Sequence, residues 1–259
     1  MDHLNRIDTY PKKRDQLNTP IWVGETGEKE NAIYWATTQL FEANYIDFSF
    51  WPRKKMDTQN ILNSIHKPND WDLISVFTKG SSRPDSIRTG KIFNELLENI
   101  KLANCDYFEV VCNAILTRIP AKIEAENYRQ ERFKCSYFMK DTLHKSKFYR
   151  TGEPVKINLD SKDKKQLWSE LSIELQPTEW VIHHFNNLDN GKHCLSIRAS
   201  VAKSAQLTIL INNKKVNATI ASEVFSEIGE GNYQLNKGKN IVKIMAQSNK
   251  VQLDWIKFD

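Results

Sequence analysis

A single acidic residue stands where a short apolar strand is followed by a glycine-containing turn. Glu25 closes the run IWVGE at residues 21–25, and apolar spacing predicts a helix over 31–43. Catalytic residues of (β/α)8 barrels lie at the carboxyl ends of strands, so Glu25 is a candidate nucleophile or general acid/base. A solvated turn glutamate is the alternative, because acidic residues are also common near helix N-termini.

A tryptophan ends the next predicted strand. Apolar and polar residues alternate along 45–51, which places Ile46, Phe48 and Phe50 on one face and predicts a strand that ends at Trp51. A flat aromatic ring covers the C–H face of a pyranose while a carboxylate meets its anomeric carbon. Trp51 and the acidic residue one βα unit earlier therefore suit a sugar site, although a strand-end aromatic residue is often part of a core.

Around these two residues run the motifs VGETGE (23–28), FSFWPRKKM (48–56) and NDWD (69–72). Together they resemble the last two βα units of glycoside hydrolase family 5, the retaining β-glycanases that include many cellulases, over about residues 3 to 105. The resemblance implies that Glu25 is the nucleophile and that Trp51 stacks on a sugar ring. Arg53 departs from the family, since many relatives carry a second tryptophan there.

The second catalytic group of such an enzyme has no counterpart in the chain. Retaining hydrolysis needs two carboxyl groups roughly 5–5.5 Å apart. The family carries its acid/base in an Asn-Glu-Pro motif, and the sequence contains no such motif. A whole barrel needs about 250 residues, far more than precede residue 119. We therefore expect only the last βα units of a (β/α)8 barrel, the C-terminal part of a longer enzyme or a truncated reading frame, with no glycosidase activity of its own.

The pattern of apolar and polar residues changes at about residue 119. Short alternating runs such as 180–185, 205–211 and 251–258 are separated by polar turns, which predicts an antiparallel β-sandwich. We therefore predict two domains, residues 1–118 and 119–259. No polar flexible linker separates them, so the two domains should touch.

Four motifs mark this second region: IEAE (123–126), YR (149–150), TEW (178–180) and LDWI (253–256). They resemble carbohydrate-binding module family 6, and family 35 shares much of the pattern. The resemblance covers about residues 119 to 259 and implies a jelly-roll sandwich of the galactose-binding-like kind. It also implies a polysaccharide partner, such as a β-glucan or a xylan.

The same resemblance implies a structural calcium ion. Its side-chain ligands would be Glu124, Glu126 and Asp254. Glu124 and Glu126 would share one face of a strand, and Asp254 on the last strand would lie beside them if the first and last strands pair. Such an oxygen-rich site suits Ca²⁺, although one of the acids could equally belong to a solvated face. No organic cofactor is expected.

The family clamps a sugar ring between a tyrosine and a tryptophan, with an asparagine near the last strand as the polar contact. Tyr149 matches the tyrosine, Gln252 stands in place of the asparagine, and Phe225 is the nearest aromatic substitute for the tryptophan. The amide of Gln252 can both donate to and accept from hydroxyl groups. Tyr149 could instead be a core residue.

Composition and charge reduce the classes of function that the sequence allows. The 259 residues carry a net charge of +5 with lysines spread among acids, which does not indicate nucleic-acid binding. No apolar run is long enough for a transmembrane helix, and the first six residues lack the form of a signal peptide. The parent enzyme would be extracellular or attached to the cell surface. Two functions stay open: part of a secreted β-glycanase with an appended sugar-binding module, or a non-catalytic carbohydrate-binding or adhesion protein.

Overall fold

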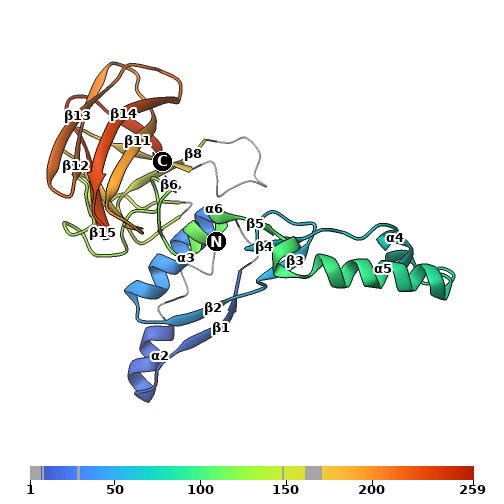
Figure 1. Cartoon of the computed structure of the whole chain (residues 1–259). Helices are drawn as coiled ribbons and strands as arrows, with labels where there is room; N and C mark the ends of the chain where they lie inside the picture. The colour runs from blue at the N-terminus through green and yellow to red at the C-terminus, as the bar shows by residue number, and fades with distance from the viewer. Residues whose placement is uncertain (1–6, 8, 28–29, 148, 161–170) are drawn as a thin grey trace.

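The chain is described here from a computed structural model, which covers residues 7, 9–27, 30–147, 149–160 and 171–259. The first six residues, where no signal peptide is expected, lie outside the described residues. Figure 1 shows a strand-rich part, coloured yellow to red, and an extended part that is blue to green. The latter contains all of the described chain before residue 119.

The N-terminal part is built around a parallel strand pair. Strands β1 (Trp22–Thr26) and β2 (Asp47–Phe50) pair in parallel, and α3 (Asn31–Ala43) connects them. This is one βαβ unit, because parallel neighbours need a crossover connection. The other elements of this part are α2 (Thr9–Leu17), β3 (Lys54–Met56), β4 (Asn63–Ile65), α4 (Trp71–Phe77), α5 (Ser86–Asn99), the 3-10 helix η1 (Leu102–Asn104), β5 (Asp106–Tyr107) and α6 (Glu109–Ile115).

The predicted alternation along β2 is confirmed. Ile46 is buried, and the rings of Phe48 and Phe50 pack against α3, at 5.4 Å from Phe41 and 5.1 Å from Tyr34 between ring centroids. The helix predicted over 31–43 also forms with those limits. Sequence periodicity therefore determined the βαβ unit correctly.

The structure does not show a barrel. The sheet of β1 and β2 has two strands, and no further strand pairs with it within the described residues. Helix α5 projects away from the rest of the chain (Figure 1). Its apolar side chains are largely exposed, with Phe93 at 42% and Leu97 at 58%.

The second part is an antiparallel β-sandwich, as predicted. Its five-stranded sheet has the order β13-β12-β15-β10-β7, and its second sheet has the order β14-β11-β16-β9-β8, with β6 also paired to β16. The strands are β6 (Ala121–Glu124), β7 (Tyr137–Phe138), β8 (Lys156–Leu159), β9 (Leu171–Leu175), β10 (Trp180–Asn187), β11 (Gly191–Ser200), β12 (Ala205–Ile211), β13 (Lys214–Ile220), β14 (Ser226–Leu235), β15 (Gly238–Ala246) and β16 (Val251–Phe258).

The core of the sandwich lies between the two sheets. Alternate residues of strands such as β10 and β15 point inward, and the rings of Phe185 on β10 and Phe258 on β16 meet with centroids 4.4 Å apart. Both rings are fully buried. This period of two residues is the pattern expected when each sheet buries one face.

Helix α3 joins the two parts. Its Trp35 belongs to the buried core of the sandwich, whereas its Phe41 packs in the βαβ unit. Thr38 donates a hydrogen bond to the Ile115 carbonyl at 2.9 Å, and the Asn127 side chain donates to the Ala32 carbonyl at 3.2 Å. The expectation that the two parts touch is met, while the exact boundary between domains stays a prediction.

Candidate functional site

The structure brings Glu25 and Trp51 to adjoining strand ends. The Trp51 backbone N–H donates to the Thr26 carbonyl at 2.7 Å, and both the Glu25 side chain and the Trp51 ring are exposed. Gly27 makes this approach possible, because a Cβ atom there would lie 2.1 Å from the Trp51 carbonyl oxygen. A carboxylate and an aromatic ring therefore lie on one open edge of the βαβ unit.

The three predicted metal ligands lie together in the sandwich. Strands β6 and β16 pair, which confirms the pairing of first and last strands, and the Ala125 N–H donates to the Asp254 carbonyl at 2.8 Å. Glu126, however, lies in the turn after β6, so the prediction that it shares a strand face with Glu124 is wrong. All three carboxyl side chains are buried.

Asp254 owes its position to a β-bulge. Arg198 of β11 lies opposite Trp255, while the next residue of β11 lies opposite Leu253, so Asp254 is the extra residue on β16. A bulge bends the strand and redirects a side chain. No periodicity in the sequence marks this position.

Two cationic side chains partly neutralise these acids. Lys122 Nζ lies 2.6 Å from Glu124, and Arg198 forms an ion pair with Asp254. Glu126 has one carboxylate oxygen that is buried without a hydrogen-bond partner. Burial raises the pKa of Glu124 to about 7, against the opposing effect of Lys122.

The pKa of Glu126 is also raised, first by burial and then by the charge of Glu124. Burial also raises the pKa of Asp254, although Arg198 opposes it. The cluster is therefore short of positive charge, and its donors are all oxygens, as a hard cation requires. In the described part of the chain, no three acidic, histidine or cysteine side chains are already arranged around one ion.

Tyr149 does not lie at the surface, and the expectation for it has to be corrected. Its side chain is 5% exposed and packs in the sandwich core. The adjacent Arg150 is also buried, with Nε 2.8 Å from Glu153 and its guanidinium group 3.6 Å from the centre of the Tyr128 ring. The YR motif thus anchors a loop inside the protein, and Tyr149 offers no free ring face to a sugar.

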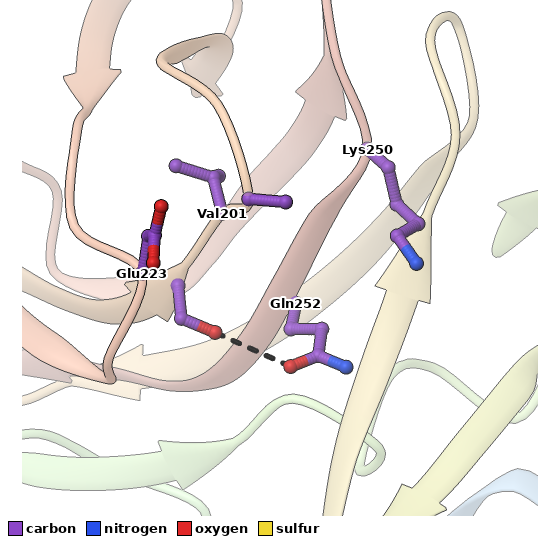
Figure 2. A pocket seen from close by; sticks show the side chains of 6 residues that line it. Val201, Glu223, Lys250 and Gln252 are labelled. Carbon is purple, nitrogen blue, oxygen red and sulfur yellow. Dashed lines mark hydrogen bonds between the residues drawn. The ribbon is translucent and has the colours of Figure 1, made fainter.

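Gln252 lies in a surface hollow of about 320 Å³, lined by Ser200, Val201, Ala202, Glu223, Lys250 and Gln252. Figure 2 shows the Gln252 amide between Glu223 and Lys250, with the Ser200 hydroxyl donating to its oxygen at 3.3 Å. The hollow combines a carboxylate, an ammonium group, an amide and a hydroxyl. Such a set can donate to and accept from several sugar hydroxyls at once.

Two further features border this face of the sheet. Phe225 is half-buried, with the Arg198 guanidinium 5.2 Å from its ring centre, so its ring is shared with the acid cluster. Glu174 lies 2.8 Å from Lys156 and 3.3 Å from Lys250. Although burial acts to raise it, the pKa of Glu174 is lowered by these two lysines, so its carboxylate is held ionised.

An aromatic row on the other sheet was missed by the sequence reasoning. Trp180 of the TEW motif points outward and is stacked with Phe138 at 6.4 Å between centroids and 25° between planes. Phe138 in turn lies 5.7 Å from Phe133, and Lys243 Nζ lies 3.7 Å from the centre of the Trp180 ring. The outward position of Trp180 in the β10 alternation was the available signal.

No protein-family model matches the chain, and no curated protein matches it either. Among solved structures, a family 36 carbohydrate-binding module in complex with calcium and xylotriose matches with 15% identity and a TM-score of 0.36, over 53% of this chain and 98% of that one. A second family 36 module, from a multidomain xylanase of the Trinervitermes trinervoides hindgut metagenome, matches with 13% identity and a TM-score of 0.31, over 34% and 76% of the two chains.

A Podospora anserina β-(1,4)-mannanase that carries a family 35 module matches with 15% identity and a TM-score of 0.34. That match covers 40% of this chain and 24% of the mannanase, so the chain spans about a quarter of that enzyme. TM-scores this low do not establish a shared fold, and the sandwich assignment follows from the chain's own strand pairing.

Proposed function

We propose that the sandwich binds a polysaccharide of the β-glucan or xylan class. The observation that carries the proposal is the hollow of about 320 Å³ at Gln252, which is lined by residues with an amide, a carboxylate and an ammonium group. Ligand pockets begin at about 300 Å³, so the hollow suits a single sugar unit of a chain that continues over the surface. Its polar groups are partly preorganised by the hydrogen bond between Ser200 and Gln252.

The row formed by Phe133, Phe138 and Trp180 supports the same function on the opposite sheet. Three neighbouring rings offer a platform for the apolar faces of sugar residues. Lys243 lies over Trp180 on a flexible stem, so a bound sugar would displace its ammonium group and then receive hydrogen bonds from it.

Affinity electrophoresis on β-glucans and xylans tests this proposal. Gln252→Ala should abolish most of the retardation. Trp180→Ala should weaken the binding free energy by about 1 kcal/mol, the scale of one aromatic contact, and so reduce the retardation. Trp22→Ala is the matched control, because Trp22 is an exposed tryptophan in the other part of the chain. Loss only in the Trp180 variant would place the site on the aromatic row. Wild-type protein that is not retarded by any glycan would contradict carbohydrate binding.

We also propose a structural calcium ion held by Glu124, Glu126 and Asp254. The unpartnered buried oxygen of Glu126 and the raised pKa values of these acids support it, since a divalent cation would satisfy both. When bound, the ion would supply charge compensation and link the first and last strands. A sugar-binding module stabilised by calcium fits the extracellular location that we propose for the parent protein.

Chelation tests the calcium proposal. A metal that binds only the folded chain stabilises it by about 2.7 kcal/mol at 100 times its Kd, so a chelator should lower the melting temperature. Asp254→Ala should abolish the difference between melts with and without chelator. Asp72→Asn, which changes an exposed acid outside the cluster, should keep that difference. Identical wild-type melts in both conditions would contradict the assignment.

For the N-terminal part, we propose that Glu25 and Trp51 form part of the active site of a glycoside hydrolase. Their exposure on one edge of a βαβ unit supports a nucleophile beside a sugar-stacking ring. The second carboxyl group would come from barrel strands outside this sequence. The alternative, a non-catalytic adhesion protein, would need neither residue.

Turnover assays test whether the site is incomplete, and a sugar-binding assay at Trp51 separates the two alternatives. Because general acid–base assistance typically contributes about 10²–10⁴-fold, the chain by itself should show no turnover of soluble β-glucans. Turnover that disappears in Glu25→Gln would contradict the proposal that the site is incomplete. Oligosaccharide-dependent quenching of fluorescence that is lost in Trp51→Phe would support the sugar-stacking role.

A further inference from the structure

The hollow at Gln252 borders a buried acid, Glu174. Glu174 lies opposite Lys156 on one neighbouring strand and opposite Gln252 on the other. Gln252 in turn lies opposite Ser200, so one row of side chains crosses β8, β9, β16 and β11. Because directly opposed residues share one face of a sheet, Glu174 stands beside the hollow that Gln252 and Ser200 line. Glu174 itself is 6% exposed.

Glu174 holds two ammonium groups. Its Oε1 lies 2.8 Å from Lys156 Nζ and accepts from the Gln176 side chain at 3.1 Å, and its Oε2 lies 3.3 Å from Lys250 Nζ. Lys250 is thus at once an ion-pair partner of Glu174 and a lining residue of the hollow. Burial acts to raise the pKa of Glu174, but the two lysines lower it, so the carboxylate stays charged.

The ionisable groups of this row and of the hollow balance one another. Lys156 and Lys250 carry two positive charges, and Glu174 and Glu223 carry two negative charges, so the four side chains sum to zero. Glu223 is exposed, and Figure 2 shows it on the side of Gln252 away from Lys250. A sugar with a carboxylate would meet the like charge of Glu223 and would compete with Glu174 for the Lys250 ammonium group.

We propose that Glu174 is a positioning residue that makes the hollow select an uncharged sugar unit over one that carries a carboxylate. This inference rests on the polysaccharide binding proposed above. An ammonium group has three donors on a flexible stem, and it pairs with whichever anion is near. By holding Lys250, Glu174 keeps these donors at the hollow for sugar hydroxyls and offsets the positive charge that would attract an acidic sugar.

Calorimetric titration of the full chain with matched oligosaccharides tests the proposal. The probes are xylohexaose with and without one glucuronic acid side group, and cellohexaose with and without carboxylates in place of its primary alcohols. The wild type should bind the neutral form of a pair more tightly. Glu174→Gln releases Lys250 and should shift the ratio of affinities towards the acidic form by about three-fold, the scale of one exposed charge pair.

Lys156→Gln should have the opposite effect and spares the buried acid. Glu174 then has one lysine fewer and holds Lys250 more firmly, so the ratio should shift towards the neutral form. The Lys156 side chain is 48% exposed and does not line the hollow, so this variant should keep the fold. Glu98→Gln and Lys101→Gln are the matched controls, because they change the net charge by the same amounts in an exposed ion pair outside the sandwich.

The outcomes separate this inference from polysaccharide binding itself. Opposite shifts in Glu174→Gln and Lys156→Gln, with the first lost when Lys250→Gln is added, support the inference. If the wild type binds the neutral oligosaccharides and both variants keep its ratio, the role of Glu174 is overturned and polysaccharide binding stands. A shift that persists after Lys250→Gln also overturns that role, because Glu174 would not act through this ammonium group. If the wild type binds no oligosaccharide, both proposals fail.

Discussion

The sandwich and the N-terminal part differ in how completely they cover their apolar side chains. In the sandwich, residues such as Phe185 and Phe258 are fully buried between two sheets. In the N-terminal part, Trp22 is 63% exposed and Leu97 is 58% exposed. Parallel sheets are normally covered on both faces, yet β1 and β2 are covered by α3 on one face. The two sheets of the sandwich therefore bury their apolar faces against each other, whereas the N-terminal part leaves large apolar side chains exposed.

The two parts also differ in whether their ion pairs are buried or exposed. The sandwich buries Arg150, which donates to the carbonyls of Tyr128 and Arg129 and pairs with Glu153. The N-terminal part instead carries exposed pairs, such as Arg88 with Asp70 at 2.9 Å. Buried pairs are highly sensitive to the loss of one partner, whereas exposed pairs contribute little.

The largest predicted effect tests this difference between buried and exposed ion pairs. Arg150→Met removes the positive charge beside Glu153, which keeps only the Tyr128 hydroxyl as a donor among the described residues, and removes the guanidinium donor from two carbonyls, so it should destabilise the sandwich by about 4 kcal/mol. Arg88→Met, the exposed counterpart, should change the free energy of unfolding by less than about 1 kcal/mol. Urea denaturation of both variants measures the difference. Similar losses of unfolding free energy in the two variants would contradict the difference between the buried and the exposed ion pair.

A second prediction concerns the helix shared by both parts. Trp35 is 2% exposed and packs in the sandwich core, so Trp35→Ala should cost about 3 kcal/mol even though Trp35 precedes the sandwich by more than eighty residues. Trp22→Ala should change stability by less than about 0.5 kcal/mol. Thermal melting followed by near-ultraviolet circular dichroism of the sandwich aromatics measures both. An unaffected sandwich in Trp35→Ala would show that α3 is dispensable for it.

A third prediction uses pH. Burial lowers the pKa of His184 to about 4, and Lys239 and Arg129 act in the same direction. Between this value and the ordinary value of 6.5, the unfolded chain binds a proton that the folded chain does not. The contribution of neutral His184 to the free energy of unfolding is therefore fully present above pH 6.5 and is lost as the pH falls towards 4.

His184→Gln removes this titration. Each pH unit corresponds to about 1.4 kcal/mol for one proton, so between pH 7 and pH 5 the wild type should lose about 2 kcal/mol more than the variant. Denaturation curves at both pH values measure the difference, and other titrating groups cancel because both proteins contain them. Parallel losses in the two proteins would rule out a role of His184.

The smallest effect is expected on the open face of α5. Leu97→Ser should alter the free energy of unfolding by less than about 0.5 kcal/mol, because the side chain is already exposed. Ile92, which is 2% exposed on the same helix, provides the contrast, and Ile92→Ala should cost about 2 kcal/mol or more. A large loss in Leu97→Ser would mean that the apolar face of α5 is covered in solution.

The sequence by itself determined the elements with clear periodicity. A spacing of 3.6 residues gave α3 at residues 31–43, and alternation gave β2 and the strands of the sandwich, because these periods fix which side chains share a face. Local patterns suffice for such features since each strand or helix must bury one side. The resemblance to family 6 modules marked the acids at 124, 126 and 254 as metal ligands and the amide at 252 as a sugar contact, and these roles stay predictions.

Only the tertiary structure decided which of these side chains are accessible. Tyr149 is buried because the loop that carries it is anchored by Arg150, and Trp180 faces outward because its strand neighbour Val181 fills the core. The bulge at Asp254 follows from the register between β11 and β16, and Trp35 reaches the sandwich because α3 packs against β6. Each of these depends on contacts between segments far apart in the chain, and no local pattern contains that information.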